Sequence, residues 1–65
     1  MNERLKKARI ESGIKLKEVA QYLNVTVRAV MRYEEGTREP SIEILKKLCD
    51  LYDVSADYLI GRKEY

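Results

Sequence analysis

Three features of the amino-acid sequence predict an all-α fold of five short helices. Apolar residues recur three and four positions apart in five segments, which is the spacing of one helix face. Residues that favour helix N-caps stand before most of these segments. No stretch alternates apolar and polar residues for long enough to make a strand. Because 65 residues enclose only one hydrophobic core, we expect a single domain over residues 1–65.

The first three predicted helices follow one another closely. Asn2 is the expected N-cap of the first helix and Gly13 its stop, and the helix face consists of Leu5, Ala8, Arg9 and Ser12. The second helix ends at Asn24, a residue type that tolerates the left-handed conformation, and its apolar positions are Leu16, Val19, Ala20 and Leu23. Thr26 is expected to cap the third helix and Gly36 to close it, and its apolar stripe consists of Ala29, Val30 and Tyr33.

Two further helices are predicted after a loop over residues 37–40. Ser41 is expected to cap the fourth helix, and Ser55 a short fifth helix that ends at Gly61. The apolar face of the fourth helix consists of Ile42, Leu45, Leu48, Cys49 and Tyr52.

The composition argues against an enzyme and against a metal or cofactor site. The sequence has no histidine and a single cysteine, so the usual general base, the commonest metal ligand and clustered thiolates are missing. Its three glycines stand too far apart to form a phosphate-binding loop. The longest apolar runs are three residues, against the roughly 20 needed to span a membrane. Without a secretory signal or an intrachain disulfide, a cytoplasmic protein is expected.

Positive charge is concentrated in the first part of the sequence. Residues 1–38 carry nine Lys or Arg against five Asp or Glu, a balance of +4. Residues 39–65 carry four against six, a balance of −2. This asymmetry indicates a basic face that meets a polyanion.

The second and third predicted helices have the spacing of a helix-turn-helix motif. They cover residues 16–23 and 26–35, and only Asn24 and Val25 separate them. In such a motif the first helix crosses the DNA backbone and the second enters the major groove. Ala20 is small where the helices approach most closely, and Val25 and Val30 are expected to pack between them.

Short motifs along nearly the whole chain make this interpretation specific. They are Gly13-Ile14, Val19-Ala20, Leu23-Asn24-Val25, Arg32-Tyr33-Glu34, Gly36, Arg38-Glu39-Pro40-Ser41 and Val54-Ser55-Ala56-Asp57-Tyr58-Leu59-Ile60-Gly61. Together they closely resemble the phage repressor and Cro-like family of helix-turn-helix proteins, also called the XRE-like family. The resemblance implies a lambda-repressor-like five-helix domain that binds double-stranded DNA as a transcriptional regulator, with repression the favoured role.

The resemblance also implies which residues contact DNA. Base edges are expected to meet Val27, Arg28 and Arg32. Phosphates are expected to meet Lys15, Leu16, Lys17, Thr26 and Arg38. Two positions depart from the family pattern, because Leu16 stands where glutamine is usual and Glu35 where asparagine is common.

Arg9 is interpreted as a structural residue. It lies on the apolar face of the first helix, where an unpaired charge would be costly. Glu34, which matches the family's buried partner of this arginine, is the expected carboxylate.

Two classes of function remain open from the sequence. The first is sequence-specific binding of double-stranded DNA, as a homodimer on a pseudo-palindromic operator, with residues 54–60 near the partner copy. The second is a protein-interaction module, such as an antitoxin or adaptor, which Leu16 and Glu35 favour. For the apolar cluster Tyr58, Leu59 and Ile60, exposure toward a second copy and burial against the first helix are both open.

Overall fold

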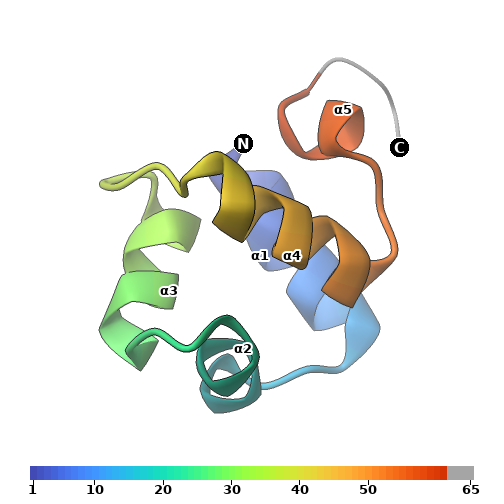
Figure 1. Ribbon diagram of the computed structural model, residues 1–65. Coiled ribbons are helices and arrows are strands. Elements are labelled where there is room, and N and C mark those ends of the chain that lie inside the picture. Colours follow the sequence, from blue (N-terminus) through green and yellow to red (C-terminus); the bar gives the residue numbers. More distant parts are fainter. Residues whose placement is uncertain (62–65) are drawn as a thin grey trace.

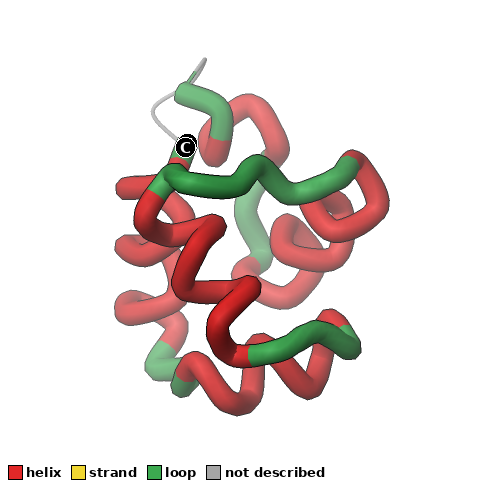
Figure 2. Tube along the Cα trace, turned by 90° about the vertical axis from the view of Figure 1, so that its left-hand side faces the viewer, coloured by secondary structure: helices red, strands yellow, loops and turns green. Residues whose placement is uncertain are grey.

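Residues 1–61 form five α-helices in the expected order. The computed structural model describes residues 1–61 of the 65, so the last four residues of the predicted domain 1–65 lie outside the described part. The helices are α1 (Asn2–Ser12), α2 (Leu16–Leu23), α3 (Val27–Glu35), α4 (Ile42–Tyr52) and α5 (Ala56–Leu59). Figure 1 shows α2 and α3 side by side at one end and α1 behind α4. Helices and loops account for all of residues 1–61, as the tube in Figure 2 shows, and the all-α prediction is confirmed.

Three of the predicted N-caps are confirmed by side-chain hydrogen bonds. The hydroxyl of Thr26 accepts from the backbone N–H of Ala29 at 3.1 Å. In the same way, Ser41 caps α4 at 3.2 Å and Ser55 caps α5 at 3.0 Å, each through the N–H three residues further on. Each hydroxyl satisfies one of the N–H groups that a helix start leaves without an intrahelical partner.

The predicted N-cap of α1 is wrong by one residue. Asn2 is already helical, and Met1 occupies the cap position without a side-chain hydrogen bond. The Asn2 side chain instead lies against Gly36, where an added Cβ would stand 3.0 Å from its Cγ. Gly36 also has a φ of +83°, a conformation that favours glycine, and a Cβ there would press on the Asn2 side chain. The Asn2 side chain thus packs against the end of α3 and does not cap α1.

The helix ends are marked by left-handed residues. Gly13, Asn24 and Gly36 adopt φ values of 71°, 59° and 83°, as their residue types led us to expect. Asp53 ends α4 in the same way with a φ of 55°. The fifth helix is shorter than predicted, because it ends at Leu59 and not at Gly61.

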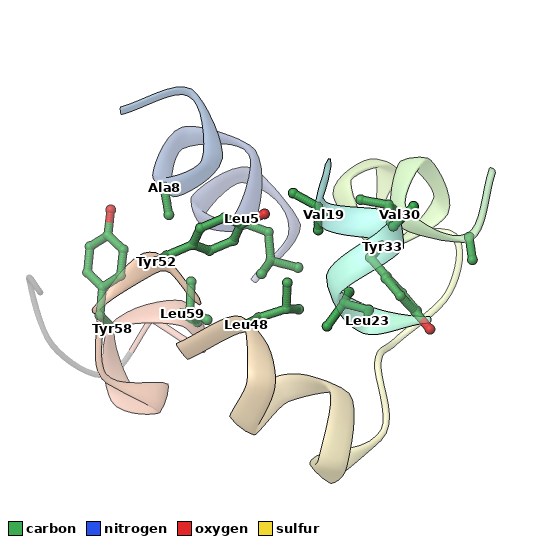
Figure 3. Packing of buried hydrophobic residues seen from close by; sticks show 12 residues of the cluster. Leu5, Ala8, Val19, Leu23, Val30, Tyr33, Leu48, Tyr52, Tyr58 and Leu59 are labelled. Atoms are coloured by element: carbon green, nitrogen blue, oxygen red, sulfur yellow. The ribbon is translucent and has the colours of Figure 1, made fainter. Parts of the chain in front are cut away.

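The hydrophobic core draws on all five helices. Figure 3 shows Leu5 and Leu48 between a group from α2 and α3 and a second group around Tyr52, Tyr58 and Leu59. The buried residues are Leu5, Ala8, Val19, Ala20, Leu23, Ala29, Val30, Tyr33, Leu48, Tyr52, Tyr58 and Leu59. Because every helix contributes, the exposed face of α3 is held by the packing of the whole domain.

Two residues predicted on apolar faces are exposed. Ser12 is in the last position of α1, beyond the part of the helix that packs. Ile42 is 73% exposed because the buried face of α4 is centred on Leu48 and Tyr52. At about 100° per residue, Ile42 points about a third of a turn away from that face.

A largely buried ion pair joins α1 to α3. Arg9 Nε donates to Glu34 Oε2 at 2.7 Å, and Nη2 donates to Oε1 at 3.3 Å. The two side chains are only 14% and 8% exposed. Arg9 Nη1 also donates to the carbonyl of Ile14 at 3.2 Å, which ties the turn before α2 to the same residue. The hydrogen bond with Glu34 raises the pKa of Arg9 above its usual value.

A second arginine fastens α5 to α1. Arg4 Nη1 donates to the carbonyl of Tyr58 at 2.8 Å, and its guanidinium carbon stands 4.8 Å from the centroid of the Tyr58 ring. Stacking on an aromatic face adds a cation–π attraction to the hydrogen bond. Arg4 is thus a structural residue at the end of α1 that faces α5.

We predict that Arg9→Ala lowers the free energy of unfolding by about 3–5 kcal/mol, because it leaves the Glu34 carboxylate buried without its partner. Urea unfolding followed by circular dichroism measures the change. Lys7→Ala, which removes an exposed cation from the same helix, is the control and should change stability by about 0.5 kcal/mol or less. An Arg9→Ala protein within about 1 kcal/mol of wild type would contradict a structural role for the pair.

We also predict a loss of stability at alkaline pH that depends on Tyr52. Burial, reinforced by the negative charge of Glu34, raises the pKa of Tyr52 to about 12. The unfolded pKa is about 10, so the neutral phenol stabilises the fold fully below that pH. Its contribution to the free energy of unfolding is lost as the pH rises from about 10 towards 12, because the phenol ionises more readily in the unfolded chain. In urea titrations, Tyr52→Phe should therefore lose less stability than wild type across this window; equal losses in the two proteins would refute the assignment.

Candidate nucleic-acid interface

The helices α2 and α3 form a compact pair with a short turn. Only Asn24, Val25 and Thr26 connect them. The turn is closed by hydrogen bonds from the N–H of Asn24 to the carbonyl of Gln21, at 3.2 Å, and from the N–H of Val25 to the carbonyl of Ala20, at 3.0 Å. Asn24 adopts the left-handed conformation that lets the chain change direction here. The geometry is that of the predicted helix-turn-helix.

The outer face of α3 carries two parallel rows of exposed side chains. Ala29, Val30 and Tyr33 are buried and hold the opposite face against the core. Val27 and Met31, 38% and 42% exposed, form one row, and the exposed residues Arg28 and Arg32 form the other. Residues four positions apart lie one above the other on a helix, so each row runs along the axis. All three predicted base-contacting residues, Val27, Arg28 and Arg32, therefore share one exposed face.

Two of the residues predicted to meet phosphate are exposed lysines at the start of α2. Lys15 is the N-cap residue, and its N–H donates to Glu18 Oε1 at 2.9 Å; Lys17 is in the first turn. Leu16 between them is half-buried and packs against the core. Its side chain has no hydrogen-bond donor, which leaves the backbone N–H as the group available to a phosphate.

The other two predicted phosphate positions stand at either end of α3. Thr26 is exposed, and its hydroxyl is already the cap acceptor of α3. Arg38 is exposed in the loop after α3. The start of this loop is fixed by Thr37, whose N–H and hydroxyl both donate to the carbonyl of Arg32, at 3.1 and 3.4 Å. The same carbonyl thus links the last turn of α3 to the segment that carries Arg38.

A surface hollow of about 170 Å³ lies where α1 meets α2 and α3. Leu16 and Met31 provide its apolar lining, and the polar lining residues are Lys6, Arg9, Glu34 and Glu35. The pair between Arg9 and Glu34 neutralises two of these charges. Lys6 is an exposed cation beside the predicted interface. No sequence motif singles it out, because only the packing of α1 brings it there.

Among residues 1–61, no three His, Cys, Asp or Glu side chains gather as a possible metal site. Burial raises the pKa of the Cys49 thiol, which opposes formation of a nucleophilic thiolate. None of the described helices is long and apolar enough to cross a membrane.

The fold and the exposed face of α3 define a helix-turn-helix domain. The family described as Helix-turn-helix matches residues 5–59 of this sequence. The chain therefore belongs to that family, in its phage repressor and XRE-like branch, as the motifs in the sequence indicated.

Three known proteins illustrate the relationship. The HTH-type transcriptional regulator ImmR of Bacillus subtilis (strain 168) is 42% identical over 64 residues, which cover 98% of this chain and 50% of ImmR. The crystal structure of a transcriptional regulator from Listeria innocua superimposes with a TM-score of 0.85 at 37% identity, over 92% of this chain and 56% of that one. The crystal structure of SinR, the master regulator for biofilm formation, in complex with DNA gives a TM-score of 0.80 at 32% identity. That match covers 91% of this chain and 95% of the SinR chain.

The chain spans about half the length of the curated relatives that it matches first. The shared part is the helix-turn-helix domain.

Proposed function

We propose that this protein binds double-stranded DNA in a sequence-specific manner and regulates transcription, as a repressor and without catalytic activity. The observation that carries the proposal is the pair of exposed arginines, Arg28 and Arg32, on the helix that follows the tight turn. Like charges four residues apart repel each other by about 0.2–0.5 kcal/mol, and an electronegative base edge relieves this repulsion. The structural similarity to SinR, which was solved in complex with DNA, supports the same conclusion.

In the proposed complex, α3 lies in the major groove. Arg28 and Arg32 donate paired hydrogen bonds to O6 and N7 of guanines, the most common specific contact of arginine with DNA. Val27, in the first turn of α3, contacts a base edge without hydrogen bonds. Because the opposite face of α3 is buried in the core, the helix holds these three side chains at fixed positions relative to one another.

Phosphates bind around this central face. Lys15 and Lys17 and the N–H groups at the start of α2 meet the backbone on one side, including the N–H of Leu16. Thr26 donates its hydroxyl hydrogen at the start of α3, and Arg38 meets a phosphate from the loop after α3. Lys6 extends the positive surface on the side of α1.

A homodimer on a pseudo-palindromic operator is the proposed assembly on DNA. One recognition helix reads only a few base pairs, and a single small module buries little surface on DNA. In the segment 54–60, Tyr58 and Leu59 are buried, so of the three apolar residues at its end only Ile60, 44% exposed, is open to a second copy. Two copies related by a dyad place their α3 helices about 34 Å apart, one turn of the duplex.

A protein-interaction module, such as an antitoxin or adaptor, is the second candidate function. The hollow lined by Leu16, Met31 and Glu35 favours it, because an apolar lining with an exposed carboxylate is a poor match for phosphate. Such an interface would hold as salt rises, since burial of apolar surface does not depend on charge.

We predict that Arg28→Ala and Arg32→Ala each weaken binding to a duplex selected from a random library by about 1–3 kcal/mol. The loss on an unrelated duplex should be smaller, because the arginines read bases. Lys17→Ala should weaken both duplexes alike and reduce the slope of log affinity against log salt by about one. Fluorescence anisotropy titrations measure all three effects.

Two outcomes of these titrations would contradict the proposal. Equal losses on selected and unrelated duplexes in the arginine variants would exclude base reading by α3. Binding that does not weaken as salt rises would exclude phosphate contacts and support the protein-interaction module.

We predict that two copies bind the selected duplex and that Ile60→Asp reduces this to one copy at the same protein concentration. A charge at Ile60 removes apolar contact with the partner copy. Sedimentation of the protein with the duplex gives the stoichiometry, and Ile42→Asp, which alters an exposed isoleucine at the start of α4, is the control. One-to-one binding of the wild type to a non-palindromic site would refute the dimer.

A further inference from the structure

The row of Val27 and Met31 is the most exposed apolar feature of the proposed DNA-binding face. Both side chains point outward from α3, and neither contributes to the buried core. Leu16 of α2 lines the same hollow as Met31, so the apolar surface continues across to the second helix. We name Val27, Met31 and Leu16 the apolar strip.

The charge beside the strip restricts what can cover it. Arg28 and Arg32 run parallel to Val27 and Met31, one residue further round the helix. An apolar protein surface laid over the strip would take these two arginines out of water without partners, which is costly. The occupant must therefore offer acceptors to the arginines and an apolar group to their neighbours at the same time.

The major groove of DNA offers both groups side by side. Guanine presents the acceptors O6 and N7, and thymine presents its C5-methyl group. Val27 has no hydrogen-bonding side-chain atom and Met31 only a weakly accepting sulfur, so apolar contact is their means of distinguishing bases. Their Cα atoms are about 6 Å apart along the helix axis, which is close to two base-pair steps of 3.4 Å.

On this basis, and on the assumption that the proposed DNA-binding function is correct, we infer that Val27 and Met31 read the C5-methyl groups of thymines next to the guanines bound by Arg28 and Arg32. Leu16 borders the strip on the α2 side. This gives a role to its apolar side chain, which cannot bind phosphate.

The test removes the methyl group from DNA without changing any hydrogen bond. Each thymine of the duplex selected from a random library is replaced in turn by deoxyuridine, and the affinity of the wild-type protein is measured by anisotropy. Burial of one methyl group corresponds to about a fourfold change in affinity. We expect a loss of this size at one or two thymines beside the guanines and none at thymines outside the contacted bases.

Variants assign the methyl contact to the strip. Val27→Ala and Met31→Ala should each bind the thymine duplex more weakly and lose the deoxyuridine effect at the thymine that the substituted side chain contacts. Lys17→Ala, a phosphate-contact variant, should still show the fourfold difference. Because Val27 and Met31 are exposed, these substitutions should leave the fold intact, which circular dichroism verifies.

Three results would overturn the inference: a selected sequence without thymine beside its guanines, equal wild-type affinity for the thymine and deoxyuridine duplexes, or an unchanged deoxyuridine effect in both strip variants. Any of these can occur while binding still depends on Arg28 and Arg32, and the proposed function then stands alone. Absence of sequence-selective binding to any duplex would instead refute the proposed function itself.

Discussion

The orientation of the exposed face of α3 depends on the ion pair between Arg9 and Glu34. Arg9 stands on α1 and contacts both Glu34 on α3 and the carbonyl of Ile14 before α2, so one guanidinium fixes three segments. The two charges are largely out of water, so they must meet in the one arrangement that satisfies both. The ion pair therefore constrains the orientation of α3 relative to α1 as much as it contributes to stability. The pair also keeps Glu34 from adding free negative charge to a face where Glu35 is already exposed.

Local hydrogen bonds set where α3, α4 and α5 begin, and packing sets which face each helix buries. Thr26 caps α3 three residues before Ala29, so the helix starts with Val27 and its exposed rows begin in the first turn. The cap and the buried Ala29, Val30 and Tyr33 together determine the direction in which Arg28 and Arg32 point.

Most of the fold could be predicted from sequence because its determinants are short in range. Thr26, Ser41 and Ser55 act on N–H groups three residues away, and Asn24 acts within its own turn. Asn2 and Ile42 could not be placed correctly, because their positions follow from contacts with distant residues and from the exact rotation of a helix. The position of Lys6 beside Met31 has the same origin, since these residues are 25 positions apart in the chain.

The departures at Leu16 and Glu35 are better understood together than singly. Both line the hollow that contains Met31, and Lys6 stands on its edge with the opposite charge to Glu35. A glutamine at position 16 would place a polar group there, whereas leucine joins Met31 and extends the apolar surface of α3 onto α2. In the proposed complex, the lysines on either side of Leu16 offset the phosphate affinity that a glutamine would have supplied, because point charges need no fixed geometry. The proposed function then divides between exposed lysines that meet the DNA backbone and a packed helix whose outer face distinguishes bases.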